Sequence, residues 1–140
     1  LDQLNGLHYY SKPFPKSLAW EWVVGHVLAL LNQSCLSVEN QIRTFVEHTA
    51  IQISSVVMRY HLTSVFLTGG GVYHSFLLKR LAHMIPNVWV QADDTLIQGK
   101  EAMAFAFLGL LKLRGEDNVL SSVTGCVKNH CSGRVYSEEL

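Results

Sequence analysis

The feature that most constrains the fold is a short apolar run that ends at three consecutive glycines. Ser64-Val-Phe-Leu-Thr68 is rich in strand-forming residues, and Gly69, Gly70 and Gly71 follow it directly. The apolar spacing after the glycines predicts a helix from about Tyr73 to Met84, which Pro86 then ends. The sequence therefore predicts a strand, a glycine turn and a helix in immediate succession.

The rest of the chain continues this alternation of helices and strands. The remaining expected elements are an extended lead-in (1–16, with Pro13 and Pro15), a helix (17–31, capped by Ser17), a helix (37–60), a strand (87–91), a polar loop (92–99), a helix (100–114, ended by Gly115) and a tail (116–140). The order α-α-β-α-β-α predicts a single α/β domain over residues 1–140 with a parallel sheet. Two strands are too few for a stable open sheet, so we expect further strands from a longer chain or from a partner.

The helix expected at 37–60 has the clearest periodicity. Apolar side chains recur at three- and four-residue spacing and predict the face that packs on the core: Ile42, Phe45, Val46, Thr49, Ile53, Val56, Val57 and Tyr60. The opposite, solvent-facing side is expected to carry Glu39, Arg43, Glu47 and His48.

The glycine turn has a chemistry of its own. In open α/β sheets, ligands collect at the carboxyl end of the strands, where glycine lets the backbone approach them closely. The helix that follows offers free N–H groups and the positive end of its dipole, which suit a nucleotide or a phosphate. Neither a P-loop nor a dinucleotide fingerprint is present. A tight turn without a ligand is the alternative interpretation.

Composition excludes several other classes of protein. Eleven basic residues balance eleven acidic ones, which argues against nucleic acid as a partner. No apolar run approaches the roughly 18 residues of a transmembrane helix. Three widely spaced cysteines favour reduced thiols in the cytoplasm, and we expect no metal at Cys126, His130 and Cys131. Lys79 and Arg80 are expected to be solvated.

Several stretches together resemble one known family. They are Tyr10-Ser-Lys-Pro-Phe-Pro-Lys-Ser17, Phe66-Leu-Thr-Gly-Gly-Gly-Val-Tyr-His-Ser-Phe-Leu-Leu78, Asp93-Asp-Thr-Leu-Ile97, Lys100-Glu-Ala-Met-Ala-Phe-Ala-Phe-Leu108 and Leu120-Ser-Ser-Val-Thr-Gly125. In this order they resemble the anhydro-N-acetylmuramic acid kinases, and they cover nearly all of the chain.

The resemblance implies a fold and a reaction. The family belongs to the acetate and sugar kinase, heat-shock protein and actin superfamily, whose members have two ribonuclease-H-like lobes around a cleft. With ATP and Mg²⁺, its members open the 1,6-anhydro ring of the amino sugar with water and phosphorylate O6. The product is N-acetylmuramic acid 6-phosphate, in cytoplasmic recycling of the cell wall.

The resemblance also implies that this chain is the C-terminal part of the second lobe and that the family protein is a homodimer. The phosphate loop and the catalytic aspartate of the family belong to the missing N-terminal lobe, so we expect no phosphoryl transfer from this chain alone.

Carried over residue by residue, the resemblance implies two sets of site residues. Thr68, the three glycines and His74 are candidates for nucleotide binding, on the adenosine side of ATP. Glu101 is the candidate catalytic residue, near the sugar or its attacking water. A glutamate in a first helical turn, favoured by the helix dipole, is the alternative for Glu101. The family often has an asparagine where His74 stands and an aspartate with an aromatic residue where Gln98-Gly99 stands.

Two alternative functions remain open. One is another sugar kinase of the same superfamily, such as an N-acetylglucosamine kinase; the Lys100–Leu108 helix and the Ser-Val-Thr-Gly stretch favour the anhydro sugar. The other is a non-catalytic nucleotide-binding module.

Overall fold

The computed structural model describes residues 1–13 and 16–136, so Pro15 lies outside the described residues. The chain divides into two compact units, residues 1–92 and residues from Asp93 onward. Each unit is treated by itself, and the expected single domain over 1–140 stays a prediction.

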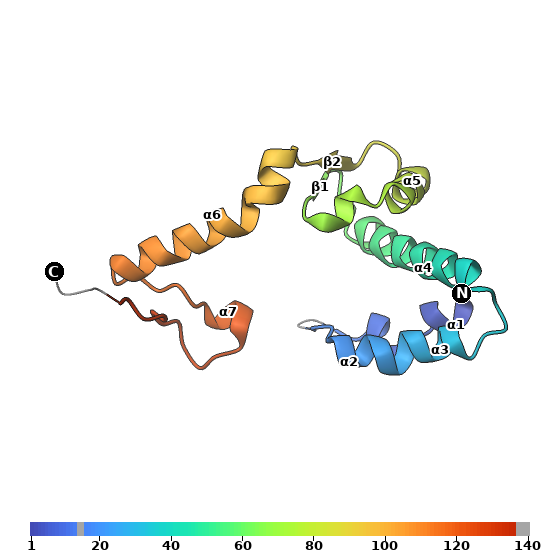
Figure 1. Ribbon diagram of the computed structural model, residues 1–140, viewed down its shortest axis with the longest axis horizontal. Coiled ribbons are helices and arrows are strands. Elements are labelled where there is room, and N and C mark those ends of the chain that lie inside the picture. The colour runs from blue at the N-terminus through green and yellow to red at the C-terminus, as the bar shows by residue number, and fades with distance from the viewer. Residues whose placement is uncertain (14–15, 137–140) are drawn as a thin grey trace. The chain divides into compact units, whose positions relative to one another are not determined.

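The first unit contains most of the elements (Figure 1). They are α1 (Asp2–Asn5), the 3₁₀ helix η1 (His8–Ser11), α2 (Trp20–Trp22), the π-helical η2 (Val23–Leu28), α3 (Ala29–Asn32), α4 (Val38–Arg59), β1 (Val65–Leu67), the 3₁₀ helix η3 (Gly70–Tyr73), α5 (Ser75–Met84) and β2 (Trp89–Gln91). The second unit contains α6 (Asp94–Leu113) and α7 (Ser121–Thr124). The predicted mixed α/β class is confirmed, whereas the lead-in 1–16 is not extended throughout, because it includes α1 and η1.

The two strands form a parallel pair, as the alternation of elements predicted. Val65 is in register with Trp89, and Leu67 with Gln91. The Val65 amide donates to the Val88 carbonyl at 2.8 Å, and the Ala92 amide donates to the Leu67 carbonyl at 2.9 Å. Within the described residues no third strand joins the pair. Phe66 and its register partner Val90 leave one face of the sheet open, at 55% and 48% exposure.

The long helix α4 begins where the sequence predicted. Ser37 is its N-cap, and the Ser37 hydroxyl accepts from the Asn40 amide at 3.4 Å. The buried face, however, differs from the prediction: it consists of Val46, His48, Ala50, Ser54 and Val57. Ile42, Phe45 and Val56, predicted to lie in the core, are exposed. The buried face differs from the predicted one because α4 packs against both α5 and α1. Amphipathic spacing alone does not specify those neighbours.

A buried polar network joins α4 to the N-terminal segment. His48, predicted to face solvent, is only 2% exposed. Its Nδ1 lies 2.7 Å from Asn5 Oδ1, and its Nε2 lies 2.8 Å from the Tyr10 hydroxyl. Gln52 Nε2 also donates to Asn5 Oδ1, at 3.0 Å. Because that amide oxygen can only accept, His48 Nδ1 carries the proton and Nε2 accepts from Tyr10. The neutral imidazole therefore forms a hydrogen bond with both of its partners, Asn5 and Tyr10.

The segment expected as one helix over 17–31 starts later and contains a π-helical turn. Its N-cap is Ala19, so the predicted Ser17 cap is wrong. The His26 imidazole lies 3.0 Å from the Trp22 carbonyl, the oxygen to which an α-helix would direct the His26 amide. Val23, Val24 and Gly25, which are weak α-helix formers, precede this position. The His26 side chain thus competes with its own amide for the Trp22 carbonyl, and the residues before it have low α-helix propensity. Together these two effects account for the wider π-helical turn.

In the second unit, α6 begins earlier than expected. Asp93 is the N-cap, and Asp93 Oδ1 accepts from the Leu96 amide at 2.8 Å. Residues 94–99, predicted to form a polar loop, are therefore helical, because this cap outweighs the low propensity of Gly99. The predicted end is confirmed: Gly115 adopts a left-handed conformation with φ of 69°.

The segment after α6 folds back as an irregular hairpin rather than a plain tail. Val119 and His130 form an antiparallel bridge. The Asn129 side chain accepts from both the amide and the hydroxyl of Ser121. Many apolar side chains of α6 nevertheless remain uncovered, and Phe105 is 71% exposed. Met103, Phe107 and Leu108 are exposed as well, because the described part of unit 2 offers little surface to bury them.

We expect Leu81→Ala to lower the free energy of unfolding by about 2–5 kcal/mol, since it removes a side chain that is only 2% exposed at the centre of α5. Urea denaturation measures this change. The control is Leu18→Ala, at a leucine that is 49% exposed in the same unit and should change stability by less than about 1 kcal/mol. Equal losses in the two variants would contradict the assigned core.

Burial lowers the pKa of His48, so its contribution to stability depends on pH. Below its ordinary pKa of about 6.5, the unfolded chain binds a proton that the folded imidazole resists, and stability falls as the pH decreases. One such proton contributes at most about 1.4 kcal/mol per pH unit. We expect His48→Gln to be less stable than the unchanged chain at pH 8 but to lose less stability between pH 7 and pH 5. Urea titrations at each pH test this, and parallel pH profiles would contradict the network.

Candidate functional site

The glycine turn links β1 to α5 with tight backbone geometry. Gly69 has φ of 83° and ψ of 173°, a conformation that residues with a Cβ avoid. The Val72 amide donates to the Gly69 carbonyl at 3.1 Å, and the His74 amide donates to the Gly71 carbonyl at 3.1 Å. The predicted strand, glycine turn and helix thus follow one another, with the 3₁₀ helix η3 between the glycine and α5.

Two features of this turn are compatible with a bound ligand: open space beside it and an unpaired hydroxyl group. A Cβ built on Gly70 or on Gly71 would meet nothing within 4 Å, so open space adjoins the turn. The Thr68 hydroxyl oxygen is buried and has no hydrogen-bond partner among the described residues. An unpaired buried hydroxyl is unfavourable, and a bound molecule can satisfy it.

His74 has a structural part in the turn. It is the N-cap of α5, and its Nδ1 accepts from the Leu77 amide at 3.1 Å. Asparagine, the residue that the resemblance implies at this position, is also a favoured N-cap residue. The first turn of α5 is therefore fixed directly beside the glycines, while contact of His74 with a nucleotide stays a prediction.

Glu101 lies in the second unit, on α6, and its side chain is exposed. The helix begins at Asp94, so Glu101 is not in the first helical turn and the dipole-based alternative for it is wrong. Among the described residues the Glu101 carboxylate forms no hydrogen bond or ion pair. The carboxylate is accessible to a ligand, and its catalytic role stays a prediction.

Sequence reasoning missed a charged cluster on the first unit. Arg80 Nε and Nη2 each lie 2.7 Å from one carboxylate oxygen of Glu47. Arg80, predicted to be solvated, is thus half-buried in an ion pair that links α5 to α4. The two residues are 33 positions apart, so no local pattern in the sequence could reveal the pair.

Comparison with known proteins decides the family. The family model described as anhydro-N-acetylmuramic acid kinase matches residues 1–138. This chain belongs to the anhydro-N-acetylmuramic acid kinase family. It is 36% identical over 134 residues to the anhydro-N-acetylmuramic acid kinase of Sulfurovum sp. strain NBC37-1, covering 91% of this chain and 36% of that protein. It is 29% identical over 149 residues to the one of Aliivibrio fischeri, covering 97% and 39%.

A third anhydro-N-acetylmuramic acid kinase, from Streptomyces avermitilis, is 33% identical over 120 residues, covering 82% of this chain and 31% of that protein. The chain thus spans roughly a third of the length of these relatives. The resemblance predicted from the sequence is confirmed as membership of a sugar kinase family. None of the helices in the described part of the chain is long and apolar enough to cross a membrane.

We expect Gly69→Ala to lower the midpoint of thermal unfolding, because a Cβ at φ of 83° costs about 1–2 kcal/mol. The matched control is Gly70→Ala, where the added Cβ meets open space and stability should stay the same or rise by up to about 1 kcal/mol. Differential scanning calorimetry of the two variants provides the comparison. Equal midpoints would show that the turn does not need its left-handed glycine.

Proposed function

We propose that this chain is part of an ATP-dependent kinase that converts 1,6-anhydro-N-acetylmuramic acid to N-acetylmuramic acid 6-phosphate during cytoplasmic recycling of the cell wall. The observation that carries the proposal is the family match, which extends over residues 1–138. The names of the relatives supply the substrate and the reaction class. In this reaction water adds to the anomeric carbon, the bond from that carbon to O6 breaks, and O6 takes the γ-phosphoryl group of ATP.

In this proposal the turn from Thr68 to Gly71 lies on the adenosine side of the nucleotide. Three features support it: open space beside Gly70 and Gly71, the unpaired hydroxyl of Thr68, and the position of the turn at the carboxyl end of a parallel strand. His74 would act by holding the first turn of α5 in place. The backbone can then approach the nucleotide without interference from side chains.

Glu101 is proposed to act at the sugar. An exposed carboxylate without a protein partner can hold and orient a water molecule beside the anomeric carbon, while the catalytic aspartate of the N-terminal lobe takes the proton of that water. Mg²⁺ would neutralise charge on the phosphates. Among the described residues, however, no group of three or more histidine, cysteine, aspartate or glutamate side chains could hold a metal ion. We therefore assign no residue of this chain to Mg²⁺.

The rest of the catalytic machinery is proposed to come from the longer family protein. The relatives are nearly three times as long as the stretch that matches, and the sheet has two strands in the described residues. We propose that the chain completes a ribonuclease-H-like lobe, that an N-terminal lobe supplies the phosphate loop and the catalytic aspartate, and that the protein forms a homodimer. The isolated chain is then expected to be inactive.

The proposal is tested on a family-length protein that contains this sequence. With ATP and Mg²⁺, we expect phosphorylation of 1,6-anhydro-N-acetylmuramic acid but not of N-acetylglucosamine, which separates this reaction from the related sugar kinases. We expect Glu101→Gln to lower kcat about tenfold or more, because the neutral amide holds the attacking water less well than the carboxylate does, with unchanged ATP affinity in calorimetry.

The matched control is Glu116→Gln, at an exposed glutamate of the same unit that pairs with Arg114. This variant should keep full activity. A family-length protein that binds ATP but phosphorylates neither sugar would favour the non-catalytic module. A protein that neither binds ATP nor phosphorylates the sugar would overturn the proposal altogether.

A further inference from the structure

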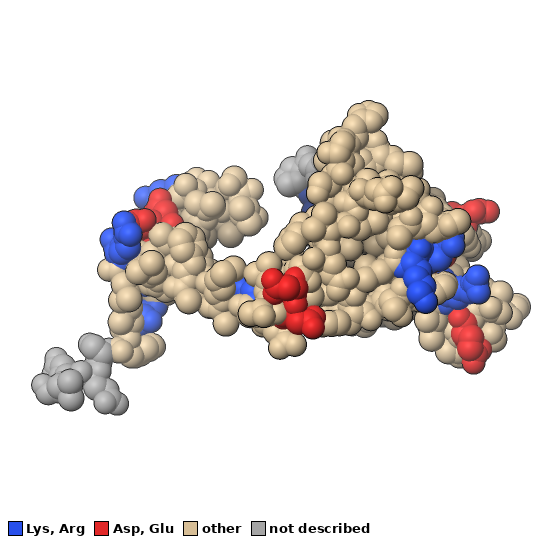
Figure 2. All heavy atoms as spheres, turned by 90° about the horizontal axis from the view of Figure 1, so that it is seen from above, with Lys and Arg blue, Asp and Glu red and all other residues tan. Residues whose placement is uncertain are grey.

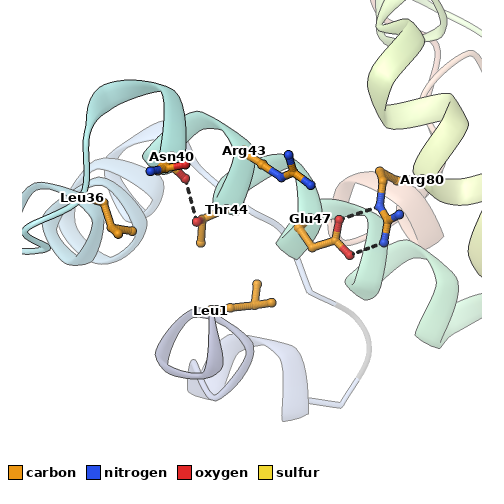
Figure 3. A pocket seen from close by; sticks show the side chains of 7 residues that line it. All are labelled: Leu1, Leu36, Asn40, Arg43, Thr44, Glu47 and Arg80. Carbon is orange, nitrogen blue, oxygen red and sulfur yellow. Dashed lines mark hydrogen bonds and ion pairs between the residues drawn. The ribbon is translucent and has the colours of Figure 1, made fainter.

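A pocket lies on the first unit, between the N-terminal half of α4, the start of α1 and α5 (Figure 3). Its volume is about 410 Å³, within the range of small-molecule sites, which is roughly 300–1,000 Å³. Its polar lining consists of Asn40, Arg43, Thr44, Glu47 and Arg80, and Leu1 and Leu36 add an apolar wall. None of these residues belongs to the glycine turn.

The Glu47–Arg80 pair gives the pocket a fixed charged wall. Both contacts are 2.7 Å, and they join two guanidinium nitrogens to two carboxylate oxygens in the forked geometry that arginine favours. Arg80 holds the pKa of Glu47 below its usual range, and the charges of Arg43 and His83 act in the same direction. Glu47 is therefore ionised, and its charge is balanced by Arg80.

Arg43 supplies a positive charge that this pair does not balance. It lies one helical turn before Glu47, is exposed, and its guanidinium carbon sits 5.8 Å from the centroid of the Phe76 ring. Hydrogen bonds from the Glu39 amide and from Ser37 lower the pKa of the Glu39 carboxyl, one turn before Arg43, so this carboxylate is ionised. Figure 2 shows one group of lysine and arginine side chains on the first unit, with acidic side chains beside it.

The remaining polar groups can orient a ligand. The Thr44 hydroxyl donates to the backbone carbonyl of Asn40 at 2.7 Å, which leaves that hydroxyl oxygen free to accept. Among the described residues the side-chain amide of Asn40 has no hydrogen-bond partner. The pocket thus presents a cation (Arg43), a side-chain amide (Asn40) and an apolar wall that includes Leu36. A molecule with one anionic end and a polar, uncharged body would complement these groups.

We propose that this pocket binds a small organic oxyanion, a carboxylate or a phosphate carried on a compact neutral body. Arg43 is its ionic partner, and Arg80 is held at the rim by Glu47. The guanidinium fork matches both kinds of oxyanion, because each presents two oxygens at the spacing of two N–H donors. The volume of the pocket accommodates an organic molecule larger than a bare ion.

The test uses three related sugars that differ only at carbon 6: glucose 6-phosphate, glucuronate and glucose. Each is titrated at low salt into a family-length protein that contains this sequence, and binding is followed by calorimetry. We expect at least one of the two anions to bind and neutral glucose not to bind. The tighter of the two identifies the headgroup as phosphate or carboxylate. Equal binding of glucose and both anions, or no binding of either anion, would overturn the proposal.

Three variants separate a built site from diffuse attraction to positive charge. Arg43→Gln should weaken anion binding at least tenfold, whereas Lys79→Gln, which removes a charge on α5 outside the pocket lining, should change it less than twofold. Glu47→Gln should strengthen binding severalfold, because it releases Arg80 to the ligand. If Lys79→Gln weakens binding as much as Arg43→Gln does, the surface attracts anions without forming a site and the proposal fails.

Discussion

The buried face of α4 is the surface on which the rest of the first unit depends. His48 ties the N-terminal segment to it through Asn5 and Tyr10, and Glu47 ties α5 to it through Arg80. The two residues are adjacent in sequence, yet their side chains anchor different neighbours. The strand β1 starts a few residues after α4 ends, so the same helix also sets where the sheet begins. The position of the glycine turn is thus fixed from both ends, by β1 before it and by α5 after it.

Features that depend on neighbours in the sequence could be predicted. The run Val65–Leu67, the glycines after it and the Ser37 cap are local signals, and each produced the expected element. The parallel pairing also followed, because a strand, a helix and a second strand leave few other arrangements. For the same reason the sequence alone predicts the turn as a candidate nucleotide site. Its chemistry requires only residues that lie next to one another.

Features that depend on distant partners could not be predicted. His48 carries a polar side chain on a helix, and only contacts with residues 38 and 43 positions away make it a core residue. The Glu47–Arg80 pair has the same origin. The early start of α6 was missed for a different reason: Gly99 suggested a loop, while the Asp93 cap extended the helix across it. Glu101 thus moved from the first turn into the body of the helix, which changes the electrostatic reasoning about it without deciding its role.

The open face of the sheet affects how this chain behaves in solution. Phe66 and Val90 lie side by side on a parallel pair whose outer edges bear no further strand in the described residues. Short apolar strands with free edges are templates for pairing with other chains, and Lys or Pro residues that would block such pairing are absent from β1 and β2. The fraction of chains that associate through these edges therefore rises with protein concentration. At high concentration, edge-to-edge association between chains competes with folding.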